Sequence, residues 1–268
     1  MVVLITGITG GLGGILAPYL IEKGMTVYGT SRNPSTKMEG VKMLPMNITD
    51  IPSVQNCLTT VVKQEGRIDA VINCINKLVI GSVEETTVEE FRESYETNVI
   101  GAYTLNQQIL PIFRKQNKGL IINMSSAGGI LSIPYFGSYT SSKAALESMS
   151  ESLYHELRGT NIDVVVMQPI AMHIDRPATG KHIELSAQVK PNSKSHKMVK
   201  KMKVDTLNSK ITPLMVSKKI YEVLIYKGKR PFRVRMGMSK GFSFLKRIAP
   251  QSVLDFVLKK ALPTGVIE

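Results

Sequence analysis

The chain has 268 residues, of which 43% are hydrophobic, and a formal net charge of +13 at pH 7. This length and composition suffice for a single domain, residues 1–268, with a sizeable core. No apolar run is long enough to span a membrane, and no charged leader precedes the first apolar run. Two cysteines are too few for a disulfide framework, so we expect a cytoplasmic protein without a metal site. Although the chain is strongly basic, the sequence contains no nucleic-acid-binding motif, so we expect no nucleic-acid partner.

The N-terminal segment predicts a strand, a glycine turn and a helix. The apolar run 1–6 is followed by the glycine-rich segment 7–13, and helical periodicity then runs over 14–23. Glycines in such a turn let the backbone approach a pyrophosphate at a helix N-terminus. The segment therefore predicts a nucleotide site, with a plain turn as the alternative.

Strand and helix patterns alternate along the rest of the chain. We predict further strands at 25–30, 41–46, 69–73, 119–124, 162–167 and 230–235, and helices at 51–65, 91–113, 139–158 and 213–226. Asp50 and either Thr86 or Thr87 are expected to cap helices. This alternation predicts a Rossmann-like, doubly wound α/β fold with a mainly parallel seven-stranded sheet and helices on both faces.

A serine, a tyrosine and a lysine cluster where the strand at 119–124 gives way to the next helix. Tyr139 and Lys143 are four residues apart, which places both on one helix face. A free tyrosine has a pKa of about 10, and a nearby ammonium group would lower it. We expect Lys143 to do so, while Ser126 donates a hydrogen bond to an oxygen that gains charge. On its own, a tyrosine–lysine pair is a common chance pattern.

Together these motifs resemble the short-chain dehydrogenase/reductase family, in the branch with TGxxxGxG and YxxxK. The residues that carry the resemblance, in order and at family spacing, are Thr6, Gly7, Gly11, Gly13, Asn98, Ser126, Tyr139 and Lys143. The match runs from residue 2 to about residue 169.

The resemblance implies reduction of a ketone or aldehyde to an alcohol by NADPH, or the reverse. It makes Tyr139 the proton donor and Ser126 the group that polarises the carbonyl. Lys143 would lower the tyrosine pKa and hold the nicotinamide ribose, and Asn98 would bend its helix and support a proton relay. The implied cofactor-binding residues are Gly7, Thr9, Gly11, Leu12, Gly13, Ser31, Arg32, Asn47, Ile48, Asn73, Tyr139, Lys143, Pro169 and Ile170.

The choice of NADPH over NADH rests on Ser31 and Arg32. An acidic residue at this strand end would repel a 2'-phosphate, whereas an arginine attracts one. No Asp or Glu stands there, and a merely solvated arginine is the alternative. Two departures from the family pattern, Asn76 and Ile170, replace glycines close to the cofactor and leave the binding strength open.

The C-terminal third predicts the substrate region. Residues 178–211 lose apolar periodicity and gain lysines, which is typical of a lid; a solvated loop is the alternative. We expect a mainly apolar substrate. Whether the substrate also carries an anionic group or is attached to a carrier is left open. The amphipathic tail, 240–264, resembles hydroxysteroid-dehydrogenase-like and acyl-dihydroxyacetone-phosphate-reductase-like members. It is expected to close the pocket or to touch an acidic membrane surface weakly.

The resemblance also implies a homodimer or homotetramer. Two other function classes stay open at this stage. One is a family enzyme whose net reaction is not redox, such as a dehydratase or an epimerase, and the other is a nucleotide-binding regulator or scaffold without turnover.

Overall fold

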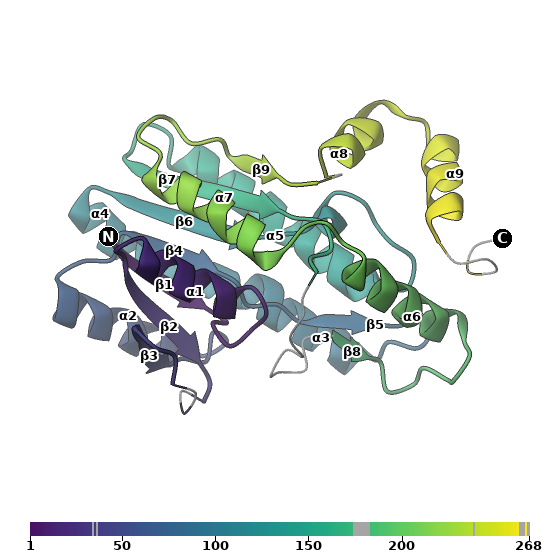
Figure 1. Cartoon of the computed structure of the whole chain (residues 1–268), viewed down its shortest axis with the longest axis horizontal. Helices are drawn as coiled ribbons and strands as arrows, with labels where there is room; N and C mark the ends of the chain where they lie inside the picture. The colour runs from purple at the N-terminus through teal and green to yellow at the C-terminus, as the bar shows by residue number, and fades with distance from the viewer. Residues whose placement is uncertain (34, 36, 174–182, 238, 263–265, 267–268) are drawn as a thin grey trace.

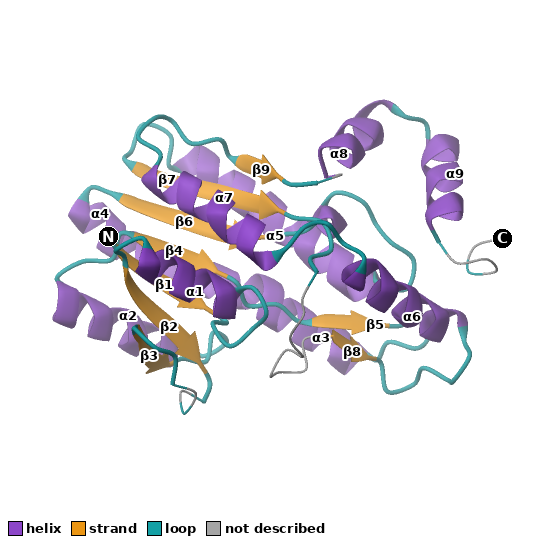
Figure 2. Ribbon diagram, in the orientation of Figure 1, coloured by secondary structure: helices purple, strands orange, loops and turns teal. Residues whose placement is uncertain are grey.

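A parallel sheet forms the centre of the molecule (Figures 1 and 2). The computed structural model describes residues 1–33, 35, 37–173, 183–237, 239–262 and 266. The seven strands lie in the order β3-β2-β1-β4-β6-β7-β9, and every pairing is parallel. They are β1 (Val2–Thr6), β2 (Thr26–Ser31), β3 (Val41–Pro45), β4 (Ala70–Asn73), β6 (Gly119–Met124), β7 (Ile162–Gln168) and β9 (Arg233–Arg235). The predicted fold class is confirmed.

Helices cover both faces of the sheet because side chains alternate between its faces along each strand. Val3 and Ile5 pack with α1 (Gly13–Glu22) and α7 (Pro213–Ile225) on one side. Val2 and Leu4 pack in a second cluster with residues of α2 (Ile51–Glu65), α4 (Gly101–Gln116) and α5 (Gly137–Glu156). The strand order reverses between β1 and β4, and in open α/β sheets a ligand cleft forms at the carboxyl ends of the strands at such a point.

Two helix starts follow the predicted capping residues. The Asp50 side chain accepts a hydrogen bond from the Ser53 backbone at 3.0 Å and begins α2. Of the two threonine candidates it is Thr87 that caps α3 (Val88–Tyr95), in a capping box with Glu90. Short polar side chains at these positions thus determine where both helices begin.

Residues 91–113 are helical, as predicted, but the helix is not regular throughout. After α3 the chain forms a π-helical turn, η1 (Glu96–Ile100), before α4 begins. The wider turn carries Asn98, whose buried amide makes hydrogen bonds to Lys77 and Ser142. Because the Asn98 side chain is buried and cannot bind water, these hydrogen bonds satisfy its polar atoms.

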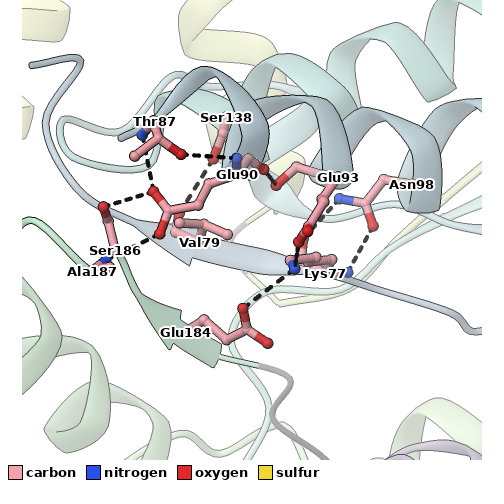
Figure 3. Close-up of polar contacts among 11 residues, drawn as sticks. Lys77, Val79, Thr87, Glu90, Glu93, Asn98, Ser138, Glu184, Ser186 and Ala187 are labelled. Carbon is pink, nitrogen blue, oxygen red and sulfur yellow. Dashed lines mark hydrogen bonds and ion pairs between the residues drawn. The ribbon is translucent and has the colours of Figure 1, made fainter. Parts of the chain in front are cut away.

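A second, two-stranded parallel sheet was not expected from the sequence. It pairs β5 (Leu78–Ile80) with β8 (Ile183–Leu185), and α6 (Lys194–Leu207) follows. Strands of three residues are too short to show a period. The Glu90 carboxylate fixes the chain after β8, because it accepts hydrogen bonds from Ser186 Oγ at 2.8 Å and Ala187 N at 3.0 Å (Figure 3). Both β8 and α6 fall within the expected lid, whose first residues, 178–182, lie outside the described part of the chain.

The tail folds as a pair of helices, α8 (Ser239–Ile248) and α9 (Gln251–Ala261), with Pro250 as the residue that caps the second. Residues 263 and 264 of the expected tail are outside the described ranges. Among the residues that the structure describes, no helix is both long and apolar enough to cross a membrane.

Candidate active site

A cleft of about 1760 Å³ lies at the carboxyl ends of the strands. Its walls include most of the residues singled out in the sequence: Gly7, Thr9, Gly11, Leu12, Gly13, Ser31, Arg32, Asn47, Ile48, Ser126, Tyr139, Lys143, Pro169 and Ile170. Asn73 and Asn98 are not among the residues that line the cleft, but each has a neighbour that does: Cys74 follows Asn73, and Lys77 is hydrogen-bonded to Asn98. The Asn73 side chain accepts a hydrogen bond from Thr6 Oγ1 at 2.8 Å, and it joins β1 to β4.

The glycine turn forms one end of the cleft. Gly7 has a φ of 64°, which favours glycine, and a Cβ there would lie 3.0 Å from Ile75. A Cβ on Gly13 would lie 2.6 Å from the Ile8 Cα and 2.7 Å from the Gly7 carbonyl oxygen. Gly13 also begins α1, one residue before the predicted start. A bare backbone at a helix N-terminus fits the diphosphate of a dinucleotide.

Two loops at the ends of β2 and β3 extend this wall. Arg32 is exposed at the end of β2. Asn47, after β3, accepts hydrogen bonds from the Thr49 backbone at 3.3 Å and from its hydroxyl at 3.0 Å. The arginine side chain therefore lies where it can reach an anionic group in the cleft.

The serine, tyrosine and lysine are brought together beyond the glycine turn. Ser126 lies two residues after the end of β6, and α5 carries the other two. Lys143 is 2% exposed, and its Nζ donates a hydrogen bond to the Met124 carbonyl at 2.9 Å. The same Nζ lies 5.8 Å from the centre of the Tyr139 ring. A strand end and one helix face thus form a compact donor set.

The protonation of this set differs from the expectation. Burial raises the pKa of Tyr139, and a hydrogen bond with Ser126 acts in the opposite direction. Burial also lowers the pKa of Lys143 to about 8, although the nearby Cys74 and Glu147 favour its charged form. The prediction that Lys143 lowers the tyrosine pKa is therefore wrong for this structure. Burial is the largest cause of the pKa shift of both groups.

Asn98 connects the site to the second sheet. Its Oδ1 accepts a hydrogen bond from Lys77 N at 2.8 Å, and its Nδ2 donates to Lys77 O at 2.8 Å and to Ser142 Oγ at 3.0 Å. The Lys77 ammonium group in turn binds Glu93 and lies 3.3 Å from the Glu184 carboxylate of β8 (Figure 3). No local pattern in the sequence indicated Lys77, because its importance comes from contacts with two distant segments.

The comparisons with known proteins fit this geometry. The pattern of the short chain dehydrogenase family matches residues 1–179. The chain belongs to this family.

Individual relatives agree with the assignment. A 3-ketodihydrosphingosine reductase from Bacteroides thetaiotaomicron is 40% identical over 168 residues, which are 63% of this chain and 62% of that protein. An NADPH-dependent 3-dehydrocapnine reductase from Ornithobacterium rhinotracheale is 27% identical over 179 residues, 62% of this chain and 63% of that protein. The chain therefore matches less than two thirds of the length of either relative. A solved short-chain dehydrogenase from Streptomyces avermitilis superposes with a TM-score of 0.80 at 26% identity, over 97% of this chain and 95% of that one.

A further residue, Glu147, holds the backbone segments on which the site is built. Glu147 is 7% exposed, and its carboxylate accepts hydrogen bonds from Ser125 Oγ at 2.6 Å and from Gln168 Nε2 at 2.7 Å. The guanidinium group of Arg233 lies 3.5 Å away. Glu147 thus ties together the ends of β6, β7 and β9. Its position, one turn after Lys143 on the same helix face, was the signal that could have indicated it.

The buried ammonium group predicts a gain in stability when it is removed. Folding lowers the Lys143 pKa from 10.5 to about 8. Between these values the unfolded chain binds more protons, so the penalty is complete below pH 8 and disappears as the pH rises past the upper value. We expect Lys143→Met to raise the free energy of unfolding at pH 7 by up to about 3 kcal/mol. The difference from the unmodified protein should narrow toward about pH 10.

Urea denaturation at both pH values measures this difference. Lys63→Met, which removes an exposed lysine from α2, is the matched control and should change little at either pH. A Lys143→Met variant that is less stable at pH 7, or a difference independent of pH, would contradict the account.

Proposed function

We propose that this chain is an NADPH-dependent oxidoreductase that reduces a ketone or aldehyde of a mainly apolar substrate to an alcohol, or catalyses the reverse. The observation that carries the proposal is the shared cleft: Ser126, Tyr139 and Lys143 line it together with a glycine cradle and an exposed arginine. Membership of the short chain dehydrogenase family supports the same reaction class.

The cofactor site is assigned to the residues at the glycine end. The cradle around Gly7 and Gly13 would hold the diphosphate, and Arg32 the 2'-phosphate. The adjoining cleft residues complete the site: Thr9, Gly11, Leu12, Ser31, Asn47, Ile48, Pro169 and Ile170, with Asn73 behind them. When bound, NADPH supplies the hydride that reduces the carbonyl carbon.

The proton chemistry belongs to Tyr139 and Ser126. Because burial raises the tyrosine pKa, the phenol keeps its proton near neutral pH and can donate it to the carbonyl oxygen. Ser126 donates a hydrogen bond to the same oxygen as charge develops on it. Both groups act as donors toward the substrate, which suits the direction of reduction.

Lys143 returns the proton to the tyrosine in this scheme. With a pKa of about 8, its ammonium group exchanges protons near physiological pH. We assign to it the nicotinamide ribose as well. Asn98, held by Lys77 and Ser142, supports the relay from the lysine to solvent.

The cleft residues beyond the tyrosine support an apolar substrate. Met198, Met202, Phe242 and Leu258 line this part of the cleft. The relative named 3-ketodihydrosphingosine reductase supports a ketone on a long-chain compound. Lys210 also lines the cleft, which supports an anionic or carrier-bound handle on the substrate.

We also propose a domain organisation, an oligomeric state and a location for the enzyme. We propose that residues 1–268 form one domain and that the lid, 178–211, of which the structure describes 183–211, covers the substrate, since β8 pairs with β5 and α6 lines the cleft. We propose a cytoplasmic homodimer or homotetramer, as the family resemblance implies. The basic tail adds a peripheral contact with a membrane.

The proton-donor assignment predicts the effect of Tyr139→Phe. We expect kcat/KM for ketone reduction to fall by about 1,000-fold, because the group that protonates the carbonyl oxygen is removed. The affinity for NADPH, measured by fluorescence titration, should change by less than about threefold, since the ring stays in place. Tyr135→Phe is the matched control, as the Tyr135 hydroxyl donates a hydrogen bond to the Val266 carbonyl at 3.3 Å. Full turnover by Tyr139→Phe would show that the assignment is wrong.

The cofactor assignment predicts a selective loss in Arg32→Ala. Removing a charge-assisted hydrogen bond should weaken NADPH binding by about tenfold or more and leave NADH binding unchanged. Isothermal titration with each nucleotide measures both affinities. Lys37→Ala removes a nearby exposed charge and should alter neither. Equal binding of both nucleotides by the unmodified protein, or unchanged NADPH binding in Arg32→Ala, would contradict the choice of cofactor.

A further inference from the structure

Three helices frame the substrate end of the cleft. One side of each faces the cavity: α6 contributes Met198 and Met202, α8 contributes Phe242 and α9 contributes Leu258. In Figure 1 the yellow helices α8 and α9 stand apart from the sheet. All three helices also carry exposed apolar side chains on residues that do not line the cleft.

Each of the three helices carries two of these exposed apolar side chains. The exposed side chains are Phe244 (66%) and Ile248 (63%) on α8, Val253 (40%) and Phe256 (58%) on α9, and Val204 (53%) and Leu207 (60%) on α6. The spacing within each pair is three or four residues, so each pair shares one helix face. We call these six side chains the apolar rim. A concentration of large exposed apolar groups around one cavity is typical of a contact surface.

Basic side chains accompany the apolar rim. Lys246 and Arg247 on α8, and Lys259 and Lys260 on α9, are exposed. The Lys260 ammonium lies 4.6 Å from the centre of the Phe256 ring. Residues 239–262 contain five basic residues and one acidic residue. The partner of this surface must therefore be apolar and negatively charged at once.

A second copy of the chain does not meet this requirement. A two-fold contact through the apolar rim would place the same cations against each other, and like charges across an interface are unfavourable. An anionic lipid surface meets both conditions, because its headgroups attract Lys and Arg while the acyl boundary accepts Phe and Ile. Helices whose exposed residues are both basic and apolar can lie in such an interface without crossing it.

We propose that the apolar rim docks on an anionic lipid bilayer and that the cleft receives its apolar substrate from the membrane. The route of the substrate rests on the proposed reductase function; the docking does not. The cavity and the exposed surface share three helices, so binding to the bilayer brings the substrate end of the cleft to the lipid.

Vesicle co-sedimentation of the full chain tests the docking. We expect binding to phosphatidylcholine vesicles that contain phosphatidylglycerol to exceed binding to pure phosphatidylcholine by at least about tenfold, and to fall with added salt. F244S/I248S should lose at least about tenfold of this binding, because two inserted side chains are removed. The matched control V83S/I225S changes two exposed apolar residues elsewhere and should bind as the unmodified protein does.

Any of three results would overturn the docking. The unmodified protein shows no preference for the anionic vesicles, or F244S/I248S binds them as the unmodified protein does. The third is that F244S/I248S changes the oligomeric mass of the protein and leaves its lipid binding unchanged. The thermal shift caused by NADPH is measured on every variant, and a preserved shift in F244S/I248S shows that it is folded. Vesicle binding without any NADPH shift in the unmodified protein would reject the reductase proposal and leave the docking intact. An NADPH shift without vesicle binding would reject the docking and leave the reductase proposal intact.

Discussion

The arrangement of the site depends on one buried charge. The Lys143 ammonium group is almost fully removed from solvent, and burying a cation is costly unless polar groups surround it. The Met124 carbonyl accepts its hydrogen bond, and the carboxylate of Glu147 favours its charged form. That same carboxylate holds Ser125 and Gln168, which directly precede the serine of the site and the Pro169 turn. The ammonium group of Lys143 and the strand ends that form the cleft are therefore positioned by one connected set of contacts.

A second polar network links this centre to the substrate region. The π-helical turn around Asn98 turns its amide toward the backbone of Lys77, whose side chain reaches Glu184 on β8. Glu90 fastens the chain just beyond that strand. Lys77 thus contacts both Asn98 of the proposed proton relay and β8 of the segment that we propose to cover the substrate.

The sequence predicted what depends on local patterns. The glycine turn, the parallel sheet and the caps at Asp50 and Thr87 each follow from residues close together in the chain. Features that depend on tertiary contacts were missed or wrong: the three-residue strands β5 and β8, the π-helical turn and the roles of Lys77 and Glu147. The tyrosine pKa belongs to the second group, because the spacing of Tyr139 and Lys143 indicates their proximity and says nothing about how deeply both are buried. Asn73 was placed in the cofactor site by its position in a motif, whereas its side chain faces Thr6.

The central claim is that this cleft transfers hydride to a carbonyl carbon. The most direct test is turnover of a long-chain ketone with NADPH that carries deuterium at the transferable position of the nicotinamide, with the product analysed by mass spectrometry. We expect one deuterium on the carbinol carbon of each alcohol formed and an equal amount of NADPH consumed. A product formed without deuterium and without consumption of NADPH would contradict it, and would favour a non-redox reaction in the same cleft.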